Sequence, residues 1–444
     1  MNKINPGDYH VILDDDIGIV YSKKKGRIKT TSPSHAQIIK QYLNNYILHN
    51  LSDSDEKIFE DYLQKQFSDY PDESARTILN LNEQKSLRKI EILLTNSCNL
   101  NCKYCYAHGG TYNQPSEIMT PENIDRYLSA LLIGRYNLVE TVMFFGGEPT
   151  LVPDTIVAIC EFFQQHFDDE DFLELPVYTM VTNGTLIDKK MAKIIQKYNI
   201  RVTISLDGPQ EINDQLRVYK NGHGTYAAIK KGFETLKNEG VSPQMVEATY
   251  TSLHASFGYS KNFIHDYIKN EFHVPKVLVA DCTDDDKEHG LAYLDPISEE
   301  FGDESLLAEK VSYQRVLYSL TQSSFCDMYC DAGLASFIIL PNGDIYPCHL
   351  YVNHLNYRIA RFSDNGYDYS EYKDFLSHTK LLHKTQNPKC TNCWASLACS
   401  ECGASLIFDQ INPARCNAER KMQEKIILDY VKKHITCYAC KAQL

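Results

Sequence analysis

Three cysteines, spaced as Cys98-x3-Cys102-x2-Cys105, are the residues of this sequence whose types and spacing point most directly to chemistry. The apolar run 89–95 before them is typical of a strand, so the cysteines lie in a loop that follows a strand's carboxyl end. Three thiolates on a short loop can hold three irons of a [4Fe–4S] cubane, which leaves the fourth iron open to another ligand. The alternatives are a zinc site, which usually shows Cys-x2-Cys pairs and a fourth ligand, and three unrelated buried thiols.

A second group of chemically able residues ends the predicted strand 141–147, where Gly146 and Gly147 precede Glu148. Two glycines allow a backbone to approach a ligand closely, and a glutamate carboxylate accepts hydrogen bonds from an ammonium group. Taken alone, the three residues favour a glycine turn with an exposed glutamate. Their place at the end of the strand after the cysteine loop favours a ligand site instead.

These residues need a scaffold that brings strand ends together, and the chain from about 88 to 310 alternates between strand-like and helix-like runs. The predicted strands are 89–95, 141–147, 176–184, 200–208, 244–251 and 274–280. The predicted helices between them include 120–133, 153–166, 188–198 and 225–238. Short strands rich in β-branched residues, joined by amphipathic helices, are typical of a parallel sheet built from βα units. The sequence therefore predicts an α/β fold with an open, partial (β/α)6 barrel of the TIM type, whose chemistry lies where strands end.

The cysteine loop, with the aromatic Tyr104 just before its third cysteine, resembles the motif of the radical SAM superfamily. The resemblance implies that the open iron chelates the amino and carboxylate groups of S-adenosylmethionine (SAM). It also implies that the Gly146-Gly147-Glu148 motif binds the methionine amino group. In that superfamily an electron from the cluster cleaves SAM into methionine and a 5′-deoxyadenosyl radical, which abstracts a hydrogen atom from the substrate.

Further polar residues follow the next predicted strands. Asn183, Ser205 and Asp207 supply short polar side chains at the height where a ribose or a substrate backbone would lie. The run SLDGPQEINDQLR, followed by GHGT, resembles radical SAM enzymes that carry a C-terminal SPASM extension. Asn213 stands where that family has histidine, so no role of the histidine is carried over. Arg217 is interpreted either as a SAM carboxylate ligand or as a structural ion-pair partner.

Most of the remaining cysteines lie after residue 311. Cys330 and Cys348 come first, with Gly343 between them. The run Cys390-x2-Cys393-x5-Cys399-x2-Cys402 follows, and Cys416 is the last cysteine of the pattern. This order resembles the SPASM pattern, except that two residues rather than three separate the cysteines at 399 and 402. The resemblance implies two auxiliary [4Fe–4S] clusters, the first held by Cys330, Cys348, Cys402 and Cys326 and the second by Cys390, Cys393, Cys399 and Cys416. A pair of structural zinc sites is the alternative.

Four cysteines and the single tryptophan remain. Cys437-x2-Cys440 has no counterpart in the pattern, and its role stays open. Cys160 falls on the apolar face of a predicted helix and is expected to be a core thiol. Cys282, at the end of a predicted strand, is either part of the active site or a loop cysteine. Trp394 lies between two of the auxiliary cysteines, where it would shield their cluster from water.

The first 85 residues contain no cysteine and differ in texture from the rest of the chain. Two short strands are predicted within 9–22, around the turn of Asp14 to Asp16, and helices are predicted to begin near Ser34 and Asp53. By position and element order this zone resembles the winged-helix-like module with which many peptide-modifying enzymes recognise a leader peptide. The strand edge around 17–21 is the expected docking place. An extension that only packs against the core is the alternative.

Length and composition set the frame. A chain of 444 residues is too long for one core, and we expect domains at 1–85, 86–310 and 311–444. Fifteen cysteines without an export signal favour metal binding in a reducing cytoplasm over disulfides. The formal net charge of −13 makes nucleic acid an improbable partner, and no apolar run has the length of a membrane span.

Together these features predict a radical SAM maturase of ribosomally made peptides with three [4Fe–4S] clusters. A thioether between a cysteine sulfur and a carbon is the favoured crosslink, and a carbon–carbon bond is second. The expected partners are a precursor peptide with a leader and an external electron donor of the flavodoxin or ferredoxin type. The residue that acts on the substrate itself is not identified. The alternatives are an anaerobic sulfatase-maturing type of enzyme, which oxidises cysteine or serine in a protein substrate, and a non-enzymatic iron–sulfur or zinc scaffold.

Overall fold

The structure is a computed structural model. It describes residues 3–70, 74–76, 85–282, 290–292, 307–322, 324–352, 354–408 and 413–441. At 74–76, 307–312, 322, 324–326 and 435–441 it describes the backbone only.

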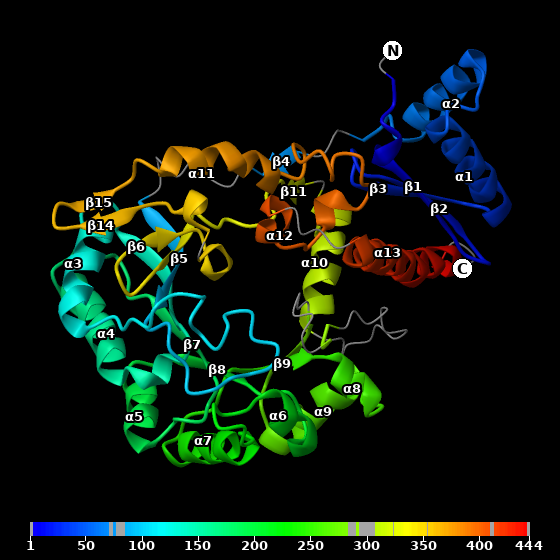
Figure 1. Cartoon of the computed structure of the whole chain (residues 1–444). Coiled ribbons are helices and arrows are strands. Elements are labelled where there is room, and N and C mark those ends of the chain that lie inside the picture. Colours follow the sequence, from blue (N-terminus) through cyan, green and yellow to red (C-terminus); the bar gives the residue numbers. More distant parts are fainter. Residues whose placement is uncertain are drawn as a thin grey trace.

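An eight-stranded sheet, in the order β10-β9-β8-β7-β6-β5-β12-β13, forms the centre of the molecule (Figure 1). Its first six strands in the chain are β5 Ser86–Leu93, β6 Leu138–Phe145, β7 Val177–Thr182, β8 Arg201–Ser205, β9 Met245–Tyr250 and β10 Val277–Asp281. Each of them pairs in parallel with the next. These six strands confirm the predicted parallel βα units, and all their carboxyl ends meet at one edge of the sheet.

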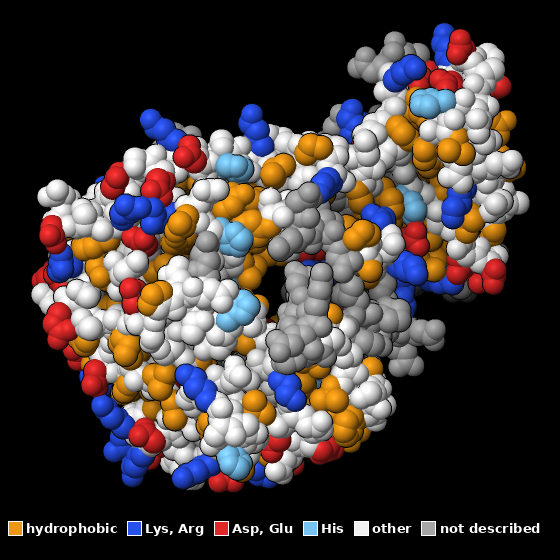
Figure 2. All heavy atoms as spheres, viewed as in Figure 1, with side chains coloured by type: hydrophobic (Ala, Val, Ile, Leu, Met, Phe, Trp, Pro, Cys, Tyr) orange, Lys and Arg blue, Asp and Glu red, His pale blue; other side chains and the backbone are white. Residues whose placement is uncertain are grey.

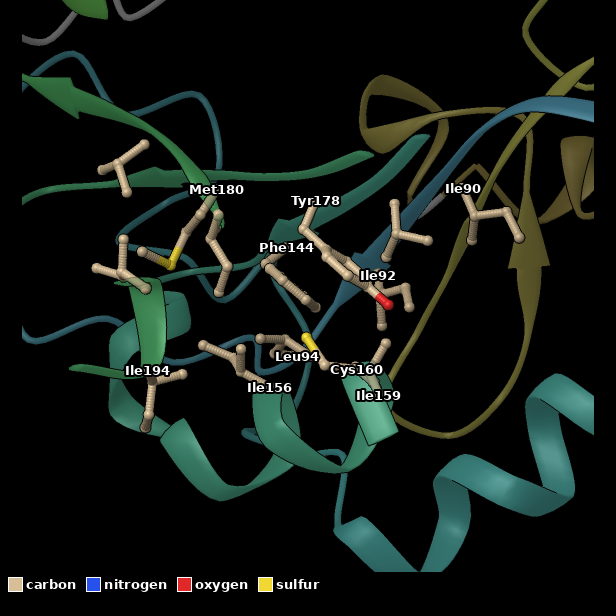
Figure 3. Close-up of a cluster of buried hydrophobic side chains, with 14 of the residues drawn as sticks. Ile90, Ile92, Leu94, Phe144, Ile156, Ile159, Cys160, Tyr178, Met180 and Ile194 are labelled. Atoms are coloured by element: carbon tan, nitrogen blue, oxygen red, sulfur yellow. The ribbon is translucent and has the colours of Figure 1, made fainter. Parts of the chain in front are cut away.

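Helices cover the outer face of this curved sheet in Figure 1. They are α3 Pro121–Leu132, η2 Pro149–Leu151, α4 Pro153–Asp168, α5 Lys189–Lys197, α6 Gln210–Leu216, α7 Tyr226–Asn238, α8 Ser252–Ser256 and α9 Lys261–Phe272. Figure 3 shows how α4 places Ile156, Ile159 and Cys160 against Phe144 and Tyr178 of the strands. Cys160 is buried in this apolar cluster, which confirms the predicted core thiol.

The N-terminal zone contains a three-stranded antiparallel sheet with β2 in the centre. Its elements are η1 Pro6–Asp8, β1 Tyr9–Leu13, β2 Gly18–Ser22, β3 Arg27–Thr31, α1 Pro33–Ile47 and α2 Asp53–Gln66. The sequence reading missed β3, because its basic residues follow a lysine turn and lack apolar alternation. The expected open edge at 17–21 is wrong, since Val20 pairs with Val11 on one side and with Lys29 on the other.

Both faces of this small sheet are covered. Val11 and Val20 pack with α1 and α2, whereas Ile12 and Ile19 pack with residues of α10 Leu307–Gln322 and α13 Pro413–Lys441. Figure 1 shows α13 beside β2 at the lower side of the N-terminal zone. Because side chains alternate along a strand, one sheet joins the N-terminal helices to the C-terminal part of the chain.

The C-terminal part also extends the central sheet. β12 Ser336–Ile339 pairs in parallel with β5, and β13 Ile345–Tyr346 pairs antiparallel with β12. The other elements are β4 Ser74–Arg76, β11 Ser324–Cys326, η3 His349–Tyr351, η4 Leu355–Tyr357, β14 Arg361–Ser363, β15 Gly366–Asp368, α11 Tyr372–His378, η5 Thr379–Leu382, η6 Ser396–Ala398 and α12 Gly403–Ile407. The barrel sheet is thus completed by strands from beyond residue 310, which the sequence division did not anticipate. No helix among the described residues has the length and hydropathy of a membrane span.

Candidate active site

A cavity of about 450 Å³ opens at the carboxyl ends of the barrel strands. Figure 2 shows the molecule hollowed near the middle of the face in view. The predicted site residues that line the cavity are Cys98, Cys102, Cys105, Tyr104, Gly146, Gly147, Glu148, Asn183, Ser205 and Arg217. Residues far apart in the sequence therefore converge because parallel strands bring their ends to one edge.

The three-cysteine loop, residues 96–105, is held against the turn that follows β6. The Gly147 N–H donates to the Thr95 carbonyl (2.8 Å), and the Glu148 N–H donates to the Ser97 carbonyl (2.9 Å). A methyl group at Gly147 would lie 2.2 Å from the Ser97 carbonyl oxygen, and one at Gly146 would lie 2.6 Å from that of Thr95. The glycines were expected to make room for a ligand. In the structure they let two backbones of the protein approach each other.

The Glu148 carboxylate is fixed by the protein itself. Its Oε1 accepts from the Thr150 N–H (3.1 Å), the Thr150 hydroxyl (2.5 Å) and the Thr182 hydroxyl (2.6 Å), and Oε2 accepts from the Asn183 N–H (2.8 Å). The side chain is 1% exposed, and burial raises the pKa of its carboxyl. Four donors thus tie the turn after β6 to the end of β7, and only Oε2 retains capacity for an ammonium group.

A buried chain of hydrogen bonds joins Tyr104, Asp207 and Arg217. The Tyr104 hydroxyl donates to Asp207 Oδ2 (2.6 Å) and accepts from Arg217 Nη1 (2.7 Å), and the Thr249 N–H donates to Asp207 Oδ1 (3.1 Å). Burial raises the pKa of Tyr104 well above its ordinary range, which keeps the phenol a donor. Asp207 is fully buried and does not line the cavity, so the expectation that it meets the cofactor is not met. It supports Tyr104 from behind.

Of the three residues in this hydrogen-bond network, Arg217 has a buried N–H donor without a partner among the described residues. Its Nε is buried and makes no hydrogen bond with the described part of the chain, while the residue lines the cavity. A buried, unpaired donor on a permanent cation is stabilised by an anion. Of the two roles considered for Arg217, this geometry suits a carboxylate ligand, with Tyr104 holding the other end of the guanidinium.

Asn183 and Ser205 lie in the cavity wall in different ways. Asn183 Nδ2 donates to Asn99 Oδ1 (2.9 Å) and lies 3.8 Å from Cys98 Sγ, so it positions the three-cysteine loop. Ser205 ends β8 and lines the cavity. Cys282, for which two interpretations were open, also lines it, directly after β10.

Two acidic residues near the cavity were not predicted from the sequence. Glu247 lies in the middle of β9 and lines the cavity, and burial raises the pKa of its carboxyl. Glu91 lies in β5, where it accepts from Lys89 Nζ (2.6 Å) and contacts Nδ1 of His349 (3.0 Å), another residue of the cavity wall. Burial alone would raise the pKa of Glu91, but His349 and Lys89 lower it to about 2. For Glu247 the available sequence feature was a lone charged residue in an otherwise uncharged strand.

The three-cysteine loop fits a cluster with an open iron. Its thiols share one wall of a cavity large enough for a further ligand. Burial raises the pKa of Cys98 to about 11 and that of Cys102 to about 12, so the thiolates need a cation beside them. Iron would supply that positive charge, and the cavity beside the loop offers space for a further ligand.

The first auxiliary cysteine set contains Cys330, Cys348 and Cys402. All three pack against one apolar cluster, which Cys105 of the three-cysteine loop also contacts. Burial raises the pKa of Cys348, and the nearby thiols of Cys330 and Cys402 raise it further. The side chain of Cys326, the proposed fourth member, lies outside the described residues.

The second auxiliary cysteine set contains Cys390, Cys393, Cys399 and Cys416. The thiols of Cys390 and Cys393 influence the pKa of Cys416, and all but Cys416 influence that of Tyr329, so the four lie in one neighbourhood. Burial raises the pKa of Cys399 to about 12. The side chains of Cys437 and Cys440 lie outside the described residues.

Comparisons with known proteins agree with this site. The sequence pattern of the Radical SAM superfamily matches residues 92–255. An uncharacterized protein of Methanocaldococcus jannaschii is 31% identical over 263 residues, which cover 59% of this chain and 85% of that protein. The radical SAM cyclopropyl synthase TigE of Paramaledivibacter caminithermalis is 29% identical over 219 residues, 47% of this chain and 44% of that protein. The chain thus spans less than half the length of that relative.

A cysteine-type anaerobic sulfatase-maturating enzyme of Clostridium perfringens is 26% identical over 294 residues, 58% of this chain and 73% of that enzyme. Among solved structures, native anSMEcpe with bound AdoMet has a TM-score of 0.53 at 20% identity and covers 75% of this chain and 99% of that one. This likeness shows a shared fold. The family's sequence pattern matches residues 92–255, and a relative that is 31% identical is covered over 85% of its length. Together with the cysteine loop at the end of a parallel barrel strand, these matches show that the chain belongs to the radical SAM superfamily of enzymes.

Proposed function

We propose that this radical SAM enzyme matures a ribosomally made precursor peptide by installing an oxidative crosslink. A thioether between a cysteine sulfur and a carbon is the favoured product, and a carbon–carbon bond is second. The observation that carries the proposal is the arrangement of cysteines. Seven auxiliary cysteines are described in addition to the three of the cysteine loop, and three of the seven share an apolar cluster with Cys105.

Cys98, Cys102 and Cys105 would hold the SAM-binding [4Fe–4S] cluster. When bound, that cluster and SAM supply a radical that removes a hydrogen atom from the substrate. The Arg217 guanidinium would bind the SAM carboxylate through its unpaired Nε, held in place by Tyr104. Asn183 and the Gly146-Gly147 turn keep the three-cysteine loop fixed.

The auxiliary sets would hold two further [4Fe–4S] clusters, which makes three in all. Crosslinking removes two hydrogens from the peptide, so an electron acceptor is needed after the first hydrogen has left. Cys348 of the first set is adjacent in sequence to His349, which lines the cavity. An acceptor at this set would therefore lie directly behind the cavity wall. An external carrier of the flavodoxin or ferredoxin type would supply and collect electrons.

The N-terminal zone would bind the leader of the precursor in the manner of a winged-helix-like module. Among the described residues β3 pairs with β2 alone, so within this part of the chain its other edge is open to an extended peptide. The strand is half-buried, with Thr30 exposed. An added strand gains backbone hydrogen bonds with little demand on sequence. β3 thus replaces the edge at 17–21 as the proposed docking place.

Docking at β3 is tested by Lys29→Pro and Thr30→Pro, with leader binding measured by calorimetry. Neighbouring amides of an edge strand point alternately toward β2 and away from it. One substitution therefore blocks the open edge, and the other disrupts pairing with β2. We expect the folded variant of the two to lose leader binding and to keep SAM cleavage. Unchanged binding in both variants would contradict docking at β3.

Product formation is tested by incubating the anaerobically reconstituted enzyme with SAM, a reductant and each short cysteine-containing peptide that a search of the neighbouring reading frames identifies. We expect the peptide to lose the mass of two hydrogens and one cysteine thiol to become resistant to alkylation. Cys98→Ala is the inactive control. A peptide that stays unmodified while SAM is consumed would contradict the proposal.

A second candidate is a sulfatase-maturating type of reaction on a protein substrate. Similarity to the Clostridium perfringens enzyme over 73% of its length favours it. The product would then carry an aldehyde, which hydrazine reagents trap, and no crosslink. The non-enzymatic scaffold considered from the sequence is set aside by the family assignment.

A further inference from the structure

The N-terminal zone reaches the second cysteine set directly. Lys23, at the turn after β2, is 7% exposed, and its Nζ donates to the carbonyl oxygens of Thr391 (2.7 Å) and Cys393 (3.4 Å). Thr391 lies between two of the four cysteines of the set. A residue near the amino end of the chain thus places a buried ammonium group on the loop that carries Cys390 and Cys393.

The backbone of the N-terminal zone closes over the same loop. A methyl group on Gly7 of η1 would lie 2.3 Å from the Asn392 carbonyl oxygen, so the two backbones are in contact. The His10 ring stacks on Trp394, with centroids 3.9 Å apart and planes 5° from parallel. Tyr21 meets the same indole edge-on at 6.0 Å. Trp394 was expected to shield a cluster from water, and in the structure it is itself covered by β1 and β2.

Charged groups of both signs lie near the second set, whereas the charged groups that act on the first set are acidic. Near the second set, Arg420 Nη1 lies 3.9 Å from Cys393 Sγ, and the buried Lys384 donates to the Leu397 carbonyl (2.7 Å). Glu419 and Glu401 also lie near this set. Near the first set, the charged groups that act on its thiols are Glu91 at Cys348 and Asp331 at Cys330.

We propose that Lys23 tunes the second auxiliary cluster, raising its reduction potential from within the N-terminal zone. The inference rests on the proposed assignment of Cys390, Cys393, Cys399 and Cys416 to a [4Fe–4S] cluster. A cluster with four thiolates is already anionic and gains another negative charge on reduction. A buried cation stabilises the reduced form more than the oxidised form, because its attraction is weakly screened there. Lys23 is a positioning residue that does not touch the substrate.

Asp8 gives the proposal a test of opposite sign. Its Oδ1 lies 3.2 Å from Lys23 Nζ, so the carboxylate partly cancels the ammonium charge. Lys23→Gln keeps a donor for the two carbonyls but removes the charge, and the potential should fall. Asp8→Asn removes the cancelling charge, and the potential should rise. A side chain that only filled space would not produce shifts of opposite sign.

The experiment is a potentiometric titration of the anaerobically reconstituted full chain, followed by electron paramagnetic resonance. Cys98, Cys102 and Cys105 are first replaced by alanine, so that only auxiliary clusters contribute. We expect Lys23→Gln to lower one of the two midpoint potentials by about 59 mV. For a one-electron couple this shift corresponds to about a tenfold change in the equilibrium constant of reduction. Asp8→Asn should raise the same midpoint. Lys24→Gln, the same change at the exposed neighbour, should leave both midpoints as they are.

Unchanged midpoints in Lys23→Gln would overturn the proposal. Where Lys23→Gln does not retain its iron, Asp8→Asn decides alone, and a midpoint that does not rise overturns the proposal equally. A parent protein with iron for only one auxiliary cluster would overturn the cluster assignment, and the tuning role with it. Shifted midpoints in an enzyme that makes no crosslink would support the role of Lys23 and contradict only the proposed reaction.

Discussion

The three-cysteine loop and the second cysteine set are both built from cysteines, but one is open to a cavity and the other is covered by another part of the chain. The loop carries three cysteines and lines a cavity of about 450 Å³, so its thiols are beside open space. The second set carries four cysteines and is closed by the N-terminal zone through Gly7, His10 and Lys23. This difference agrees with the proposed roles, in which the loop's cluster keeps a coordination position free for a ligand and the second set's cluster is fully ligated for electron transfer.

The two regions also differ in what holds them. Backbone contacts between neighbouring strand ends position the loop, and Gly146 and Gly147 make these contacts possible. Ionic and aromatic contacts between distant parts of the chain position the second set. Lys23 and Thr391 are 368 residues apart in the sequence. The comparison teaches that the catalytic loop depends on local steric fit and the second set on the docking of another part of the chain.

The largest expected effect comes from removing the loop's cysteines. Replacing Cys98, Cys102 and Cys105 by alanine should abolish SAM cleavage and remove about four of about twelve irons. Iron analysis and chromatography of 5′-deoxyadenosine measure the two effects. Cys160→Ala, at a buried thiol in the barrel core, should keep both iron and cleavage. A triple variant that still cleaves SAM would contradict the assignment of these three cysteines to the SAM-binding cluster.

A variant of the second set should separate the two regions functionally. Cys390→Ala should retain uncoupled SAM cleavage and lose the crosslinked product, because electrons could no longer leave the first set through the second. Circular dichroism must show a folded protein, since thiolate clusters contribute to folding. Equal loss of cleavage and product in a folded variant would mean that the second set serves the catalytic loop rather than electron transfer.

Steric fit at the loop is tested by Gly147→Ala. The added methyl group would meet the Ser97 carbonyl oxygen at 2.2 Å, so the three-cysteine loop must shift. Displacement of reacting groups by about 1 Å can lower a rate about a hundredfold, and SAM cleavage should fall on that scale. Gly134→Ala meets nothing within 4 Å at a backbone φ of +74°. That control should cost about 1 kcal/mol of stability and leave cleavage unchanged.

The smallest effect is expected from Tyr104→Phe. The change removes the hydroxyl that links Asp207 to Arg217, and leaves buried polar groups unpaired at a cost of about 1–3 kcal/mol. Part of this cost should appear as about tenfold weaker SAM binding, because Arg217 loses its support. Equilibrium binding of SAM to the reconstituted enzyme measures it. Unchanged affinity would show that Arg217 is held by other contacts or does not bind SAM.

Local patterns in the sequence determined the barrel and its chemistry. Apolar runs separated by amphipathic segments predicted all six parallel strands from β5 to β10, because each run must bury both faces of a central strand. The spacing of Cys98, Cys102 and Cys105 predicted their loop at a strand end, and Glu148 followed the next strand as expected. Features of this kind depend on residues close together in the chain, so the sequence displays them directly.

Only the tertiary structure decided which groups meet. Asp207 is buried behind Tyr104, and the Glu148 carboxylate accepts hydrogen bonds from the protein itself. The strand at 18–22 is the central strand of its sheet rather than an edge strand. The tertiary structure also brought Lys23 to the second cysteine set. These outcomes depend on which apolar faces pack together and on which buried polar groups find partners, and both are settled by contacts between residues far apart in the chain.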